Sequence, residues 1–152
     1  MLAKECIQQY KNSGKIHAVT FHTVLHPLCD LEVANKVAEE AEAIHKVVYV
    51  NELEQEEIRF NPEDRCYLCK KTLFQKLMDY AAEQGISIIM EGTNEDDLHV
   101  YRPGLKAIKE LGVLSPLAEV GFTKAEVRKL AEELGISVAS RPSTPASYTH
   151  LR

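Results

Sequence analysis

The chain has 152 residues, of which 45% are hydrophobic and 27% are charged, so its size and composition are those of one ordinary globular domain. Its formal net charge of -5 argues against a surface built to attract nucleic acid, because domains of that kind are usually basic. It contains no apolar run of the roughly 18–20 residues that a membrane span requires and no signal-peptide order at its start, which predicts a cytoplasmic protein without a membrane partner.

Helix and strand signals alternate through the first part of the chain. Residues 1–12 are weakly amphipathic, and residues 16–24 contain the apolar and β-branched side chains of a strand. Residues 30–41 carry one apolar stripe against a Glu-rich face, which predicts a helix leading into a strand at residues 45–50. The acidic stretch 51–57 has no apolar period and indicates a surface loop or an irregular helix.

The alternation continues in the second part. A helix is expected over residues 73–85, followed by a buried strand at residues 86–90, which are almost continuously apolar. A short helix is expected at residues 105–111. The segment 123–135 opens with a capping box and predicts a further helix, and residues 136–139 have the pattern of one more short strand.

This order of elements predicts an α/β fold, in which helices cover both faces of a doubly wound parallel sheet. Ligands gather at the carboxyl ends of the strands in such sheets. The loops that follow the expected strands are therefore the first places to look for function.

A pair of cysteines lies at residues 65–71, which read RCYLCKK. Cys66 and Cys69 are expected just before a helix and beside basic residues, and both features favour the thiolate form. The spacing suits zinc, an iron–sulfur cluster or a redox disulfide, although a complete metal site needs about four ligands. Cys6 and Cys29 are interpreted as small buried hydrophobic residues.

The loop after the expected strand at residues 86–90 reads EGTNEDD from Glu91 to Asp97. Its carboxylates could hold Mg²⁺ through oxygen ligands while Thr93 or Asn94 contacts a nucleotide. The same residue types would also form an ordinary polar turn, so the loop alone leaves both interpretations open.

A Tyr-Arg-Pro-Gly turn at residues 101–104 places a cation at the end of that loop. Arg102 could bind a phosphate through its guanidinium group, although an exposed arginine beside a turn is also common. Of the six histidines, His99 is the candidate ligand, because it lies in the same loop.

Four segments taken together resemble the LarE-type ATP-dependent sacrificial sulfur transferases, which belong to the PP-loop ATP pyrophosphatases. They read NPEDRCYLCK, EGTNEDD, YRPGL and SPLAE, and they occupy residues 61–70, 91–97, 101–105 and 115–119. The resemblance implies an incomplete Rossmann-like nucleotide-binding domain of the PP-loop type over residues 1–145. Residues 146–152 are then an atypical tail.

The resemblance implies an enzyme that uses ATP and Mg²⁺ to adenylylate a carboxylate of a pyridinium mononucleotide and then replaces AMP with sulfur. The product feeds synthesis of the nickel-pincer cofactor of lactate racemase. A homo-oligomer is implied for the full-length protein.

The resemblance also assigns roles to individual residues. Cys66 and Cys69 match a pair that, together with a third cysteine, holds a [4Fe–4S] cluster in some members, whereas other members sacrifice a protein cysteine. The positions that match the loop facing ATP and Mg²⁺, and the basic residue of the following turn, are Glu91, Thr93, Asn94, Asp97 and Arg102.

Two segments of the family pattern have no counterpart in the sequence. One is the Ser-Gly-Gly-x-Asp-Ser pyrophosphate loop, and the other is a Cys-Leu-Ala-Ser/Thr-Arg stretch with the sacrificial or third cluster cysteine. No catalytic residue is therefore assigned. We expect a fragment truncated at both ends that does not transfer sulfur alone.

Two other functions stay open. A PP-loop enzyme that thiolates tRNA is one, although the acidic charge balance disfavours binding to tRNA. The other is a small non-enzymatic module in which Cys66 and Cys69 hold a metal such as zinc.

Overall fold

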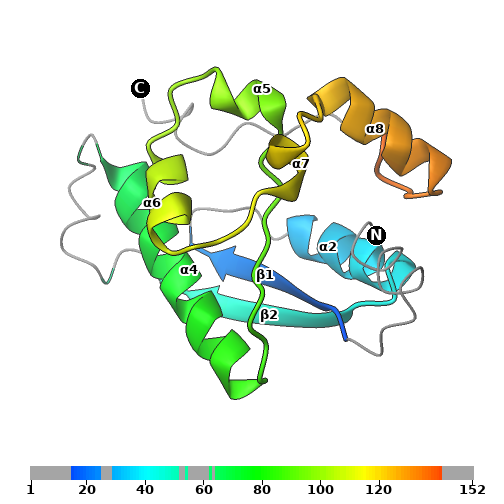
Figure 1. The fold of residues 1–152 in the computed structure, drawn as a ribbon. Coiled ribbons are helices and arrows are strands. Elements are labelled where there is room, and N and C mark those ends of the chain that lie inside the picture. Colours follow the sequence, from blue (N-terminus) through cyan, green and yellow to red (C-terminus); the bar gives the residue numbers. More distant parts are fainter. Residues whose placement is uncertain (1–14, 25–28, 52–53, 55–61, 63, 142–152) are drawn as a thin grey trace. The chain divides into compact units, whose positions relative to one another are not determined.

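The computed structural model describes residues 15–24, 29–51, 54, 62 and 64–141. These residues form six helices and two strands, an α/β composition (Figure 1). The chain divides into two compact units, one formed by residues 1–51 with 130–152 and the other by residues 52–129. In the described part of the chain, no helix has the length and apolar character needed to cross a membrane.

The first unit is built on a parallel pair of strands, β1 (His17–Thr23) and β2 (Ile44–Val50). The register runs from His17 opposite Ile44 to Thr23 opposite Val50. Helix α2 (Cys29–Glu40) connects the strands and packs against both of them (Figure 1). This β1–α2–β2 crossover confirms the strand, helix and strand predicted at residues 16–24, 30–41 and 45–50.

A chain of hydrogen bonds fastens α2 to the sheet. The Asn35 amide nitrogen donates to Glu39 at 2.7 Å, so the Asn35 oxygen is left to accept from Nδ1 of His45 at 3.0 Å. Nε2 of His45 is then the acceptor for the hydroxyl of Thr20, also at 3.0 Å. One polar row therefore links the helix to both strands.

The sheet of the first unit is less covered than the sequence predicts. The buried side chains here are small, namely Thr23, Ala38, Ala41 and Val50. Tyr49 on β2 is 72% exposed, and α2 is the described helix of this unit that packs on the strands. Helices on both faces are thus not found among the described residues of this unit.

The second unit is mostly helical. It contains α4 (Arg65–Glu83), α5 (Glu95–Leu98), α6 (Gly104–Glu110) and α7 (Pro116–Glu119), while α8 (Lys124–Glu133) straddles the boundary between the units. Helix α4 packs along α6, and α5 contacts α7. The buried residues of this unit are Ala81, Thr93, Gly104, Ala107, Ile108 and Val113.

Helix α4 begins eight residues earlier than the sequence predicted. It starts at Arg65, so Cys66 and Cys69 lie inside the helix and not before it. The reason is that residues 65–72 contain no glycine or proline, and their lysines and leucine are good helix formers. The expected end is confirmed, because Gly85 follows α4 with a positive φ of 68°.

The prediction of a strand at residues 86–90 is wrong. Only Met90 forms a bridge, a parallel one with Leu114, and Ile88 is 61% exposed. An apolar run becomes a buried strand only when neighbouring strands pair with it along its length. Leu114 supplies that pairing at a single position.

The predicted strand at residues 136–139 is also wrong, because residues 137–140 form turns. The backbone N–H of Ser137 donates to Glu40 on α2 at 3.1 Å, where a strand would donate to a neighbouring strand. The Ser137 hydroxyl bond to Glu40, followed by this backbone bond, holds the pKa of the Glu40 carboxyl below its ordinary value.

Helix α6 confirms the short helix expected at residues 105–111, and α8 confirms the helix expected after the capping box. Both arms of that box are present: the N–H of Thr123 donates to the Glu126 carboxylate at 2.9 Å, and the N–H of Glu126 donates to the Thr123 hydroxyl at 3.4 Å. The expected helix at residues 1–12, most of the acidic loop and the tail at residues 146–152 lie outside the described residues.

Candidate functional site

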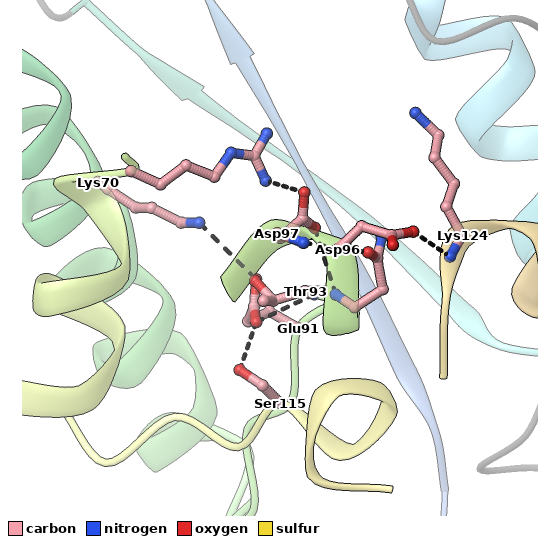
Figure 2. Close-up of polar contacts among 9 residues, drawn as sticks. Lys70, Glu91, Thr93, Asp96, Asp97, Ser115 and Lys124 are labelled. Atoms are coloured by element: carbon pink, nitrogen blue, oxygen red, sulfur yellow. Dashed lines mark hydrogen bonds and ion pairs between the residues drawn. The ribbon is translucent and has the colours of Figure 1, made fainter. Parts of the chain in front are cut away.

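The candidate site is the loop at residues 91–97 with the side chains that contact it, all within the second unit. The loop follows the bridge at Met90 and runs into the short helix α5. Figure 2 shows side chains from α4, from the loop itself and from the segment after α6 converging on Glu91.

Glu91 is the centre of this polar cluster, and its side chain is only 13% exposed. One carboxylate oxygen accepts from the N–H of Thr93 at 3.1 Å and from the hydroxyl of Ser115 at 2.5 Å. The other accepts from the hydroxyl of Thr93 at 2.8 Å. Thr93 is itself 4% exposed. These two predicted ligand residues therefore bind each other inside the loop.

Asn94 and Asp97 form the capping box of α5. The Asn94 side chain accepts from the N–H of Asp97 at 3.3 Å, and the Asp97 carboxylate accepts from the N–H of Asn94 at 3.2 Å. This reciprocal arrangement satisfies backbone donors at the helix start. It also fixes where both side chains lie.

Arg102 pairs with the other oxygen of Asp97, at 2.7 Å. Arg102 is 51% exposed and Asp97 22% exposed, so the pair lies at the surface of the loop. The Tyr-Arg-Pro-Gly turn and the acidic loop, which the sequence singled out separately, thus form one contiguous group.

The cysteine helix reaches the same group through Lys70. Its ammonium lies 3.7 Å from the Glu91 carboxylate. Helix α6 approaches α4 closely at Gly104, where a Cβ would lie 2.9 Å from Cδ of Lys70 and 3.5 Å from the carbonyl oxygen of Cys66. Cys66 is exposed and Cys69 is partly buried, and both are free of disulfide bonds.

The two lysines beside Cys69 are directed to acids. Lys70 faces Glu91, and Lys71 donates to the hydroxyl of Tyr67 at 3.0 Å and lies 3.5 Å from Glu110. The hydroxyl of Tyr67 in turn donates to Glu110 at 2.5 Å. The sequence predicts that these cations favour the thiolate form of the cysteines. In the structure, however, the two lysines contact acidic side chains.

Titration reflects this cluster on α4 and α6. The Tyr67 hydroxyl, as the main cause, holds the pKa of the Glu110 carboxyl below its ordinary value and raises the pKa of Lys71. The Lys71 ammonium also lowers the pKa of Glu110, and the Glu110 carboxylate also raises the pKa of Lys71.

Sequence reasoning missed the support given to the loop by residues 114–124. The N–H of Glu95 donates to the carbonyl of Phe122 at 2.8 Å. The N–H of Lys124 donates to the Asp96 carboxylate at 2.7 Å (Figure 2). Ser115 belongs to the SPLAE segment of the family resemblance, but the resemblance assigns it no role. Ser-Pro is a helix-start signal, and nothing in a sequence says that this hydroxyl reaches a carboxylate 24 residues away.

His99 contacts the loop only from the outside. Its Nε2 lies 2.9 Å from Glu95 one turn away, and its side chain is 72% exposed. The geometry is that of a surface pair of residues four apart on a helix, so it adds little to the site.

The donor set suits the two predicted inorganic groups unequally. Mg²⁺ needs only one or two protein carboxylates when phosphates complete its coordination, and the loop offers those of Glu91 and Asp97, each of which already accepts hydrogen bonds and contacts a cation. A [4Fe–4S] cluster needs more thiolates than Cys66 and Cys69 provide. Within the described ranges, no group of three or more His, Cys, Asp or Glu side chains is placed to hold a metal ion.

The described residues contain a parallel β–α–β crossover and, after a bridged extended segment, a loop that carries carboxylates and contacts cations. They form an α/β protein that is compatible with a Rossmann-like fold. No protein-family model matches the chain. Several curated proteins, however, have sequences similar to that of this chain.

Pyridinium-3,5-bisthiocarboxylic acid mononucleotide synthase of Lactiplantibacillus plantarum is 34% identical over an alignment of 144 residues that covers 89% of this chain and 52% of that protein. An uncharacterized protein of Synechocystis is 40% identical over 116 residues, 76% of this chain and 43% of the relative. An uncharacterized protein of Methanocaldococcus jannaschii is 38% identical over 78 residues, 51% of this chain and 31% of the relative.

The chain thus spans about half the length of the first two relatives. The likeness to the synthase supports the LarE-like resemblance that the four motifs indicate, and it suggests that the chain derives from an enzyme.

Proposed function

We propose that this chain carries part of the nucleotide site of an ATP-dependent sulfur transferase. The enzyme would use ATP and Mg²⁺ to adenylylate a carboxylate of a pyridinium mononucleotide, after which sulfur replaces AMP, in synthesis of the nickel-pincer cofactor. The main support is convergence: the acidic loop meets the neighbouring Tyr-Arg-Pro-Gly turn through Arg102–Asp97, and it meets the cysteine helix, which lies earlier in the sequence, through Lys70–Glu91. Similarity to a synthase that makes a bisthiocarboxylic mononucleotide points the same way.

The Arg102–Asp97 pair suits a ligand that brings both signs of charge. A nucleotide phosphate offers an anion to Arg102, and the Mg²⁺ that travels with it offers a cation to Asp97. Each residue therefore exchanges one partner of opposite charge for another, which offsets the cost of separating the pair. Mg²⁺ would neutralise charge on the phosphates, while Thr93 and Asn94 hold the loop in shape or contact the nucleotide.

The first test is binding of Mg·ATP to the chain, measured by isothermal titration calorimetry. Wild type should bind, and Asp97→Asn and Arg102→Met should each weaken binding by about tenfold or more, as expected for loss of a charge-assisted contact. Lys106→Met is the matched control, because it removes an exposed cation of α6 whose carboxylate partner is Glu110 at 3.9 Å, outside the loop. Equal affinities for wild type and both loop variants would refute the proposed nucleotide site.

The second test concerns the reaction. In a complete protein containing this chain, release of AMP and pyrophosphate should depend on a pyridinium carboxylate mononucleotide. Release that depends on tRNA would favour the thiolation enzyme, which the net charge of -5 disfavours. Bound zinc without any ATP turnover would favour the metal-binding module.

A further inference from the structure

The segment Ser115-Pro116-Leu117-Ala118-Glu119 has no part in the proposed chemistry, yet it contacts the loop at Glu91, whose side chain is mostly buried. Ser115 stands at the N-cap position of α7, where a serine hydroxyl ordinarily accepts from the backbone of the helix. No such bond is made here. The hydroxyl instead donates to the Glu91 carboxylate at 2.5 Å (Figure 2). Its hydrogen bond therefore serves the loop and not its own helix.

The backbone around Ser115 is hydrogen-bonded to the extended segment that leads into Glu91. The N–H of Leu114 donates to the carbonyl of Ile89 at 3.0 Å, and the N–H of Glu91 donates to the carbonyl of Leu114 at 2.9 Å. These two bonds form the parallel bridge. Ser115 is thus held next to Glu91 by backbone as well as by side chain.

Glu91 depends on this donor more than an exposed carboxylate would. Its side chain is 13% exposed, so water replaces lost donors poorly. Two of its hydrogen bonds come from Thr93 in the same loop, and Lys70 lies at the longer distance of 3.7 Å. Ser115 provides the short bond from outside the loop, so it determines how the carboxylate is oriented against the rest of the unit.

We propose that Ser115 is a positioning residue of the nucleotide site, which acts through Glu91 to hold residues 91–97 in the conformation that presents Asn94 and Asp97. The identity of the ligand rests on the proposed function; the mechanical role of Ser115 does not. Partners of this indirect kind usually change metal or ligand affinity by about 10–100-fold.

The test uses Ser115→Ala and Ser115→Thr, the second of which keeps the hydroxyl. Thr20→Ala is the matched control, because it also removes a half-buried hydroxyl with a 3.0 Å hydrogen bond but lies in the other unit. Two readouts are taken on the whole chain: amide hydrogen exchange at Thr93, whose N–H donates to Glu91, and calorimetric binding of Mg·ATP.

Ser115→Ala should speed exchange of the Thr93 amide and weaken Mg·ATP binding, each by about tenfold, with a melting temperature close to that of Thr20→Ala. Ser115→Thr should restore both. If Ser115→Ala does not fold, Ser115→Cys, a weak donor, takes its place.

The outcomes separate the two ideas. Unchanged Thr93 exchange in Ser115→Ala would overturn the positioning role. Faster exchange in a chain whose wild type shows no Mg·ATP binding would overturn the proposed function and leave the support of the loop by Ser115 standing. Faster exchange with unchanged Mg·ATP affinity would show that Ser115 does not act on the ligand site.

Discussion

Thr93 shows how a residue type that suggests a ligand contact can be used for internal structure. Its hydroxyl and its N–H both donate to Glu91, and only 4% of its surface is exposed. A buried carboxylate that loses a donor keeps its desolvation cost without compensation. The stability of the loop should therefore depend on this hydroxyl before any ligand binds.

We predict that Thr93→Val lowers the free energy of unfolding by about 1–3 kcal/mol, because it keeps the shape of the side chain but leaves one oxygen of Glu91 without its donor. Thr93→Ser, which keeps the hydroxyl, should cost less. Urea unfolding followed by circular dichroism measures both variants. A Thr93→Val protein as stable as wild type would mean that water replaces the hydroxyl bond to Glu91.

Gly104 is the residue at which α6 comes closest to the cysteine helix. A Cβ there would meet Cδ of Lys70 at 2.9 Å, and this methylene belongs to the side chain that reaches Glu91. Because Lys70 is flexible it can move, but in moving it leaves the carboxylate.

We predict that Gly104→Ala changes the free energy of unfolding by no more than about 1 kcal/mol, because the higher helix propensity of alanine offsets the crowding. Its Mg·ATP affinity should fall to that of Lys70→Met, since both variants remove the cation from Glu91. Calorimetric titration of the two single variants and the double variant tests this coupling. Additive losses in the double variant would contradict it.

At the scale of elements, the sequence is informative where a structure is specified locally. The β1–α2–β2 order, the end of α4 at Gly85 and the capping box of α8 each depend on residues within a few positions of one another. The predicted strand at residues 86–90 failed for the opposite reason. Its apolar pattern does not contain the partner strand that would bury it, and Leu114 alone pairs with it.

The same limit applied to the site. The sequence identified the acidic loop, the turn with Arg102 and the cysteine pair, and the structure brings all three into one unit. It did not indicate that Glu91 is bound by Ser115, because a contact across 24 residues depends on the packing of the intervening helix α6.

Helices α4 and α6 are also joined by the cluster of Tyr67, Lys71 and Glu110, which makes a prediction about pH. The pKa of Glu110 is lowered on folding. Its contribution to the free energy of unfolding is therefore present above the unfolded pKa and is lost as the pH falls through the folded value. The pKa of Lys71 is raised on folding. Its contribution to the free energy of unfolding is therefore present below the unfolded pKa and is lost as the pH rises through the folded value.

Tyr67→Phe should therefore be less stable than wild type near neutral pH, and the difference should shrink at both acidic and strongly alkaline pH. The effect should be small, because the groups are near the surface. Urea unfolding at a series of pH values measures it, with Tyr80→Phe as a control on the same helix away from Glu110. A difference between wild type and Tyr67→Phe that is constant with pH would mean that only ring packing is lost.

At the scale of the whole molecule, the cysteine pair is considered as part of a larger set of metal ligands. Cys66 and Cys69 lie one turn apart on α4, with α6 close to the backbone of Cys66 at Gly104. Two thiolates alone complete neither a structural zinc site nor a [4Fe–4S] cluster, so a metal bound by this pair would need further ligands from other parts of the protein or from a partner.

We predict that a complete protein containing this chain, purified without oxygen, binds iron with matching acid-labile sulfide, and that Cys66→Ala or Cys69→Ala abolishes it. Elemental analysis and the visible absorption of the cluster measure the result. Cys6→Ala and Cys29→Ala are the controls and should keep the iron, because neither belongs to the pair. Zinc that is stoichiometric and survives air would instead identify a structural site. If all four variants lost metal alike, the assignment of Cys66 and Cys69 as the ligands would fail, and their place on α4 beside Lys70 would have to be explained by packing alone.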